Sequence, residues 1–184
     1  DLNSGTASDL REVAKIIYAV DNGVPSVNAR FFQLVNGGYD THSDQGAADP
    51  NGSHFQLHAE VGNALKAFYD DLGDMGVADK VCTIVWSEFS RRVFQNDNGT
   101  DHGSQGPVFV VGGGVNGGVY GNHPNISESA LDRDGNSVYS QDVANAFRST
   151  DIRDVYGTIL KHWMNMPEGQ ILSGVLPADT GDPK

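Results

Sequence analysis

Two short motifs pair a carboxylate with an imidazole, a combination that binds divalent metal ions. Asp40 and His42 stand two positions apart in a polar stretch, and Asp101 and His102 are adjacent. Each pair alone also fits an exposed turn with a hydrogen-bonded histidine. Together the two pairs predict a metal site formed by all four side chains. Because carboxylate and imidazole ligands suit several ions, the identity stays open among Zn, Mn, Ca and Mg.

A second group of chemically able residues, Ser87 to Arg92, lies between the two motifs. Arg91 is predicted to clamp an anion, because a guanidinium binds phosphate, sulfate or carboxylate in a bidentate manner. Glu88 is predicted to be a metal ligand or to orient one. The alternative is a structural ion pair between Glu88 and Arg91 that holds the loop.

The remaining histidines and the cysteine receive less specific interpretations. His54 and His58 lie four positions apart and share a helix face. Such a pair is able to bind zinc, but without a Glu-x-x-His context a solvated helix face is the preferred interpretation. His123 is a candidate late ligand, and His162 is interpreted as a packing residue. Cys82, within an apolar run, is interpreted as a core residue.

The elements that must position these residues follow from hydrophobic periodicity. Apolar residues at helical spacing predict helices over 8–21, 54–73 and 151–165. Nearly continuous apolar runs predict strands over 29–36, 80–86 and 107–111. Such runs, with a long helix between two of them, predict an α/β fold with a mostly parallel sheet flanked by helices. Ligands bind beyond the carboxyl ends of parallel strands, so the motifs are expected to meet at one sheet edge.

Length and charge narrow the classes of function. The 184 residues predict a single domain spanning 1–184. With 12 basic and 24 acidic residues, the net charge of −12 argues against binding to nucleic acid or to an anionic membrane surface. The charge does not exclude a small anionic substrate, because a metal ion reverses the local field. The glycine-rich stretch from Gly112 does not fit a phosphate-binding loop. A nucleotide-dependent enzyme is therefore the least favoured of the functions considered.

Five ordered motifs carry a resemblance to a known family. They are Gly37-Gly38-Tyr39-Asp40-Thr41-His42-Ser43-Asp44-Gln45, Ser87-Glu88-Phe89-Ser90-Arg91, Gly99-Thr100-Asp101-His102-Gly103, the glycine-rich stretch 113–121, and Thr150-Asp151-Ile152-Arg153-Asp154-Val155-Tyr156. This pattern resembles the DUF1501 family, bacterial and often exported proteins of unknown function grouped with the alkaline phosphatase/sulfatase superfamily. Ser90 departs from the glycine usual in that family.

The resemblance implies a fold, a site and a location. It implies a partial alkaline-phosphatase-like fold in which Asp101 and His102 match an Asp-His-Gly metal-binding string, and Asp40 and His42 match ligands of a second ion. It also implies a periplasmic or secreted protein. Since family members are about twice as long, the chain resembles the C-terminal half of a larger domain. The missing N-terminal half would then be a partner and would carry the nucleophile.

Two functions follow as expectations. The first is a metal-dependent hydrolase module for phosphate or sulfate esters, in which the metal stabilises the nucleophile and the leaving group. The alternative is a non-catalytic, exported binding or structural module on the same scaffold, which the absence of a recognisable nucleophile favours.

Overall fold

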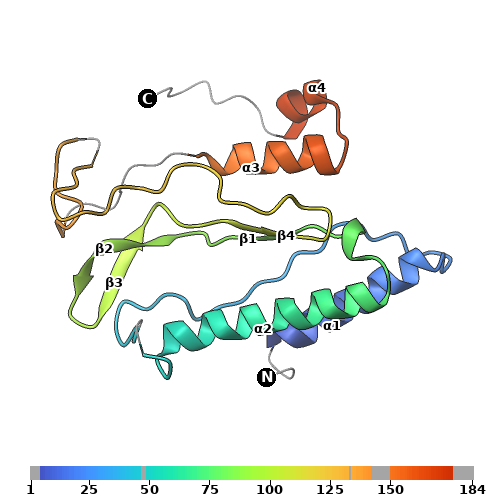
Figure 1. Cartoon of the computed structure of the whole chain (residues 1–184), viewed down its shortest axis with the longest axis horizontal. Helices are drawn as coiled ribbons and strands as arrows, with labels where there is room; N and C mark the ends of the chain where they lie inside the picture. The colour runs from blue at the N-terminus through green and yellow to red at the C-terminus, as the bar shows by residue number, and fades with distance from the viewer. Residues whose placement is uncertain (1–4, 47–48, 133, 142–149, 176–184) are drawn as a thin grey trace. The chain divides into compact units, whose positions relative to one another are not determined.

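The computed structural model describes residues 5–46, 49–132, 134–141 and 150–175 (Figure 1). The chain divides into two compact units, one made of Asp1–Gly117 with Ile126–Ala146 and the other of Gly118–Asn125 with Phe147–Lys184. Among the described residues, no helix has both the length and the apolar character needed to cross a bilayer.

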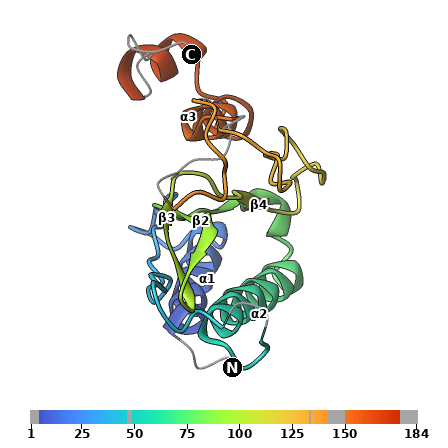
Figure 2. The same cartoon turned by 90° about the vertical axis from the view of Figure 1, so that its left-hand side faces the viewer.

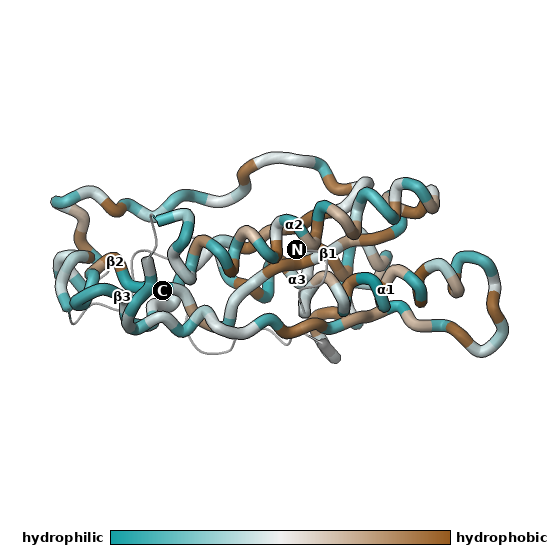
Figure 3. Tube along the Cα trace, turned by 90° about the horizontal axis from the view of Figure 1, so that it is seen from below, coloured by the Kyte–Doolittle hydropathy of each residue, from teal (hydrophilic) through white to brown (hydrophobic). Residues whose placement is uncertain are grey.

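Two long helices form the core of the first unit. α1 (Gly5–Asp21) and α2 (Ser53–Asp74) pack side by side in both views (Figures 1 and 2). Apolar and polar residues alternate along both helices (Figure 3), as expected for helices that bury one face. The buried residues recur at helical spacing: Ala7, Leu10, Val13, Ala14, Ala64, Phe68 and Leu72. The helices predicted over 8–21 and 54–73 are therefore confirmed, with ends that differ by no more than three residues.

The end of α2 leads the chain into the small sheets. Gly76 adopts a positive φ of 70°, and its N–H donates to the carbonyl of Gly73 at 2.9 Å. Val77 then donates to the carbonyl of Leu72 and lies only 2% exposed against the helix pair. This left-handed turn ends the helix as glycine C-caps do. The short 3-10 helix η1 (Ala78–Lys80) follows.

The sheets differ from the predicted architecture. β1 (Thr83–Val85) pairs antiparallel with β4 (Phe109–Val111), and β2 (Ser90–Asn96) pairs antiparallel with β3 (Gly99–Gly103). In the described part of the chain these are two separate two-stranded sheets. The predicted mostly parallel sheet, and with it the partial alkaline-phosphatase-like fold, is wrong. The physical reason is that the β2–β3 hairpin turns the chain back, so β4 returns antiparallel to β1, whereas a parallel pair needs a crossover connection.

The predicted strand over 29–36 is also wrong. These residues form no helix or strand in the described structure and pair with no strand there. Phe31 is 73% exposed and Val35 is 82% exposed, so the run does not enter the core of its unit. An apolar run alone does not specify a partner strand, and without one no ladder forms.

A tyrosine joins α2 to the first sheet. The Tyr69 hydroxyl lies 2.8 Å from Oγ1 of Thr83 in β1 and donates to the carbonyl of Val111 in β4 at 2.6 Å. Burial raises the pKa of the Tyr69 phenol. One side chain therefore fixes both strands of the sheet against the helix.

The second unit holds the remaining helices. α3 (Ile152–Thr158) begins at Asp151, whose side chain accepts from the backbone N–H of Arg153 at 2.9 Å. Its last turns widen into the π-helix η2 (Ile159–Trp163). α3 and η2 together run from Ile152 to Trp163, so the helix predicted over 151–165 is confirmed except at its ends. The short helix α4 (Glu168–Gln170) and the π-helix η3 (Ile171–Val175) follow.

Candidate metal centre

The β2–β3 hairpin carries one of the two carboxylate–imidazole pairs. Asp101 and His102 lie on β3, and Arg91 on β2 is the cross-strand partner of His102. Neither strand is among those predicted from the sequence. The signal for a hairpin was the turn Asp97-Asn98 followed by Gly99, because such residues tolerate the backbone angles of tight turns.

The loop with the other pair is fastened to the tip of this hairpin. The Asn98 side chain accepts from the Asp44 N–H at 3.0 Å and donates to the Asp44 carboxylate at 2.6 Å. The backbone carbonyl of Asn98 accepts from the N–H of Gln45 at 3.0 Å. The Thr100 hydroxyl donates to the Gln45 side chain at 3.1 Å, and Gln45 is buried. These bonds fix the position of Asp40 and His42 relative to β3.

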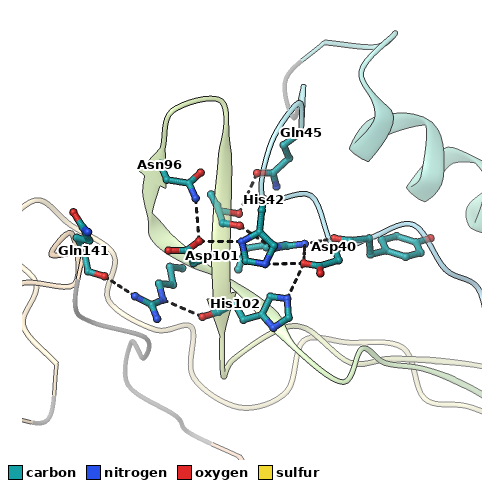
Figure 4. A network of polar contacts seen from close by, with 11 residues as sticks. Asp40, His42, Gln45, Asn96, Asp101, His102 and Gln141 are labelled. Carbon is teal, nitrogen blue, oxygen red and sulfur yellow. Dashed lines mark hydrogen bonds and ion pairs between the residues drawn. The ribbon is translucent and has the colours of Figure 1, made fainter.

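All four predicted ligands converge at this point, as Figure 4 shows. The His42 ring lies between two carboxylates, with Nδ1 3.0 Å from Oδ1 of Asp101 and Nε2 3.0 Å from Oδ1 of Asp40. The same Asp40 oxygen lies 2.7 Å from Nε2 of His102. The convergence was expected at the edge of a parallel sheet, but a hairpin and a loop produce it.

Asp40 is the centre of the group. Its Oδ1 atom meets Nε2 of His42, Nε2 of His102 and, at 3.1 Å, a guanidinium nitrogen of Arg91. The hydrogen bond from His102, followed by that from Arg91, lowers the pKa of the Asp40 carboxyl. Asp40 is therefore a carboxylate at neutral pH, as a metal ligand must be.

His42 faces one carboxylate with each ring nitrogen, and this constrains its chemistry. A neutral imidazole has a single N–H, so it donates to only one of the two carboxylates. The other nitrogen then directs a lone pair at an anionic oxygen, unless a proton or a cation lies between them. Asp101 also accepts from the Asn96 amide at 2.9 Å, which fixes its carboxylate beside Nδ1. This arrangement orients Nε2 of His42 toward Asp40 for cation binding.

Phe89 supports the centre without a polar contact. Its ring stacks on His102 with 4.0 Å between centroids and 2° between planes. The guanidinium carbon of Arg91, on β2, lies over the Phe89 ring at 4.9 Å from its centroid. His102 also stacks on His42 at 4.9 Å. Phe89 was not predictable from the sequence, because stacking partners leave no signal in residue spacing.

The two predicted catalytic residues lie in different surroundings. Arg91 is 13% exposed, and its guanidinium donates to the carbonyls of Tyr39 and Thr100 besides Asp40. Because its two terminal nitrogens are bonded to Tyr39, Asp40 and Thr100, Arg91 positions the loop. Glu88 is exposed in the bend before β2, and the described contacts include no ion pair between Glu88 and Arg91.

The other histidines and the cysteine singled out from the sequence make contacts of their own. His54 and His58 face each other on α2, and burial, followed by the charge of His58, lowers the pKa of His54. His123, in the second unit, has its Nδ1 2.7 Å from the carbonyl oxygen of Pro124. Cys82 is partly buried, and this burial raises the pKa of its thiol.

Comparison with known protein families matches residues 21–165 to DUF1501, described as a protein of unknown function. The chain belongs to the DUF1501 family. No curated protein and no solved structure matches it. The DUF1501 match contains both carboxylate–imidazole pairs and the whole β2–β3 hairpin.

The donor set of this DUF1501 chain fits a divalent ion. One ligand atom each from Asp40, His42 and His102 lies within 4.8 Å of the others. The three side chains are 56%, 49% and 47% exposed, so a coordination position stays accessible from solvent. Two imidazoles and one carboxylate with an open position are the ligands of catalytic zinc and iron sites. Beside Asp101 lies an open pocket of about 250 Å³, lined by Phe94 to Asp97 and Gln141.

Proposed function

We propose that this chain is a metal-dependent hydrolase module for phosphate or sulfate esters. The observation that carries the proposal is that Nε2 of His42 and Nε2 of His102 both lie within 3.0 Å of Oδ1 of Asp40. The proposed chemistry is of the type found in the alkaline phosphatase/sulfatase superfamily. It is proposed because the ligand types of the site match, and it does not depend on the fold.

The ligand assignment refines the expectation from sequence. Asp40, His42 and His102 are proposed as the direct ligands. Asp101 is proposed to act through His42, because its Oδ1 atom lies 3.0 Å from Nδ1 of that ring. A carboxylate behind a ligating histidine fixes its tautomer and raises its basicity. Asp101 is thus a positioning residue in this proposal.

The proposed chemistry depends on a charge reversal at the site. A divalent ion supplies Lewis-acid polarisation of the ester oxygen and lowers the pKa of a water molecule. On a chain with a net charge of −12, an anionic ester needs such a local positive centre. The neighbouring cation, Arg91, already donates to Asp40 and two carbonyls. The ion, rather than Arg91, is therefore proposed as the main anchor of the ester.

The nearby hydroxyls favour a second candidate, a module that binds without turnover. Thr41 lies between two proposed ligands, but its Oγ1 atom is buried. The Ser90 hydroxyl accepts from the N–H of Gln105 at 2.8 Å. Neither hydroxyl is presented as a nucleophile. A metal-dependent binding module on the same site is the alternative.

Turnover of nitrophenyl phosphate and nitrophenyl sulfate tests the proposal. The protein is assayed with Zn²⁺, Mn²⁺, Mg²⁺ or Ca²⁺, and again after chelation. We expect metal-dependent hydrolysis that Asp40→Asn abolishes and that Asp70→Asn, which removes an exposed carboxylate on α2, leaves unchanged. Hydrolysis that survives both chelation and Asp40→Asn contradicts the proposal. Metal binding at Asp40 without turnover of either ester favours the binding module.

A further inference from the structure

On α2, the imidazole rings of His54 and His58 face each other. The Nε2 atoms of His54 and His58 lie 3.2 Å apart, with 4.6 Å between ring centroids and 77° between ring planes. Their spacing in the sequence favours a solvated helix face. Their mutual orientation differs from that expectation, because two independently solvated rings have no reason to direct the same nitrogen at each other.

The distance between the two nitrogens matches chelation. Zinc binds imidazole nitrogen at about 2.0–2.1 Å, so two ligands at a tetrahedral angle lie about 3.3–3.4 Å apart. The observed 3.2 Å is within a few tenths of an ångström of that value. A single N–H···N hydrogen bond between two neutral rings has a similar length, and it is the competing explanation.

Tyr39 holds both rings in place. Its ring lies edge-on to His58 at 5.4 Å and to His54 at 6.5 Å. The Tyr39 hydroxyl donates to the carbonyl of Leu57 at 3.1 Å and lies 3.3 Å from the amide of Asn36. Because these contacts hold the Tyr39 ring, that ring restricts rotation of the two imidazole rings. This lowers the entropic cost of bringing two ligands onto one ion.

We propose that His54 and His58 form a second metal site, one that takes a borderline transition-metal ion such as Zn²⁺, Ni²⁺ or Cu²⁺. Imidazole suits these ions, whereas Mg²⁺ and Ca²⁺ need oxygen ligands. The site goes beyond the proposed function because it uses none of the ligands around Asp40. Water or another ligand completes the coordination.

The position of the site on α2 gives it a structural consequence. His54 and His58 span the first turns of the helix, whose N-cap, Gly52, makes no side-chain capping bond. An ion that bridges i and i+4 ties these turns together only when the helix is formed. Binding to the folded state alone raises stability by mass action.

The test isolates this site from the first one. The double variant Asp40→Asn/His102→Gln is titrated with NiCl₂ or ZnCl₂ against a chromophoric chelator, and its melting temperature is recorded. We expect about one bound ion, a rise in melting temperature, and at least about a tenfold loss of affinity on adding His54→Gln or His58→Gln, since the chelate is lost. His162→Gln, which removes a histidine from η2, serves as the matched control and is expected to change neither quantity.

Every outcome decides between the two explanations. Circular dichroism first establishes that each variant keeps its helices. If the double variant binds no ion, or binds one that neither histidine variant weakens, the pair is a hydrogen bond and the proposal is overturned. If His54 and His58 bind an ion while the Asp40 group does not, this inference stands and the proposed function fails.

Discussion

Nε2 of His102 lies 2.7 Å from Oδ1 of Asp40, although 62 positions separate the two residues. One residue is on β3 and the other in the loop before α2, so the contact exists only when the hairpin and the loop are docked. The candidate centre is therefore a property of the folded unit rather than of either motif alone.

The docking of loop and hairpin depends on a glycine. A Cβ placed on Gly99 would overlap the backbone of His42 and lie 2.6 Å from the carbonyl oxygen of Thr41. We predict that Gly99→Ala destabilises the protein by about 1–3 kcal/mol, the cost of overpacking, and weakens metal binding. Gly62→Ala on α2 is the control, because its Cβ meets open space. It should stabilise the helix by up to about 1 kcal/mol in urea denaturation. Equal effects of the two variants would contradict the described contact.

Arg91 is predicted to act on stability more than on substrate. Its guanidinium donates to the carbonyls of Tyr39 and Thr100 and is 13% exposed. Arg91→Lys keeps the charge but loses the planar fork, so we expect a loss of about 1.5–3 kcal/mol in denaturant unfolding. An unchanged unfolding free energy with a raised KM for an anionic ester would instead support the anion clamp.

Phe89 is predicted to position His102. Aromatic stacking contributes about 0.5–1.5 kcal/mol beyond the area that it buries. Phe89→Leu keeps an apolar side chain but removes the parallel ring at 4.0 Å. We expect weaker metal affinity in calorimetric titration with the stoichiometry unchanged, because the ligand atoms remain while one ring is less ordered. Phe94→Leu, on β2 and five positions further along the chain, provides the comparison. A larger effect at position 94 than at position 89 would contradict the positioning role.

Tyr69 is predicted to make stability fall at alkaline pH. Its folded-state pKa is raised, and an unfolded tyrosine titrates near pH 10. Below that value both states carry the proton and the contribution is complete. As the pH rises from about 9 to about 11, the unfolded state loses its proton first, so the unfolding free energy decreases.

Tyr69→Phe provides the comparison. It removes the bonds to Thr83 and Val111, and we expect a loss of about 1–2 kcal/mol at neutral pH. It should also show a shallower decline above about pH 10, since the titrating group is gone. Parallel pH profiles for the variant and the parent protein would show that Tyr69 does not titrate as described.

The helices and the chemically able residues were predictable from sequence, whereas the sheet was not. The periodicity of Leu10, Val13, Phe68 and Leu72 is a local signal and does not depend on distant partners. Strand pairing is different, because the same apolar run fits a parallel strand, an antiparallel strand or an unpaired segment. The turn at Asp97-Asn98 reverses the chain, so β4 runs antiparallel to β1. Residues 29–36 pair with no strand in the described structure.

The residues of the candidate site were predictable from the sequence, but their individual roles were not. Residue type alone singled out Asp40, His42, Asp101 and His102, and the structure brings them together. Their separate roles, as ligands or as supports, depend on which nitrogen faces which oxygen. Spacing in the sequence does not contain that information, and neither the Phe89 stack nor the binding of Asp44 by Asn98 was predicted.

Asp101 and Asp40 are predicted to differ in their effect on metal binding. Asp40→Asn removes a direct ligand, whereas Asp101→Asn alters the support behind His42. Loss of a supporting carboxylate weakens metal affinity about 10- to 100-fold. We therefore expect Asp40→Asn to abolish binding at this site and Asp101→Asn to leave weakened binding, measured by titration in a His54→Gln background. The reverse order would make Asp101 the direct ligand.

Anomalous diffraction from crystals grown with ZnCl₂ or MnCl₂ tests the central claim most directly. The account predicts an anomalous peak bound at about 2.0–2.2 Å by Nε2 of His42, Nε2 of His102 and Oδ1 of Asp40. It also predicts that Nδ1 of His42 stays hydrogen-bonded to Asp101. A fully metal-exposed crystal with no peak among these three atoms, and with His42 still donating to Asp40, would contradict it.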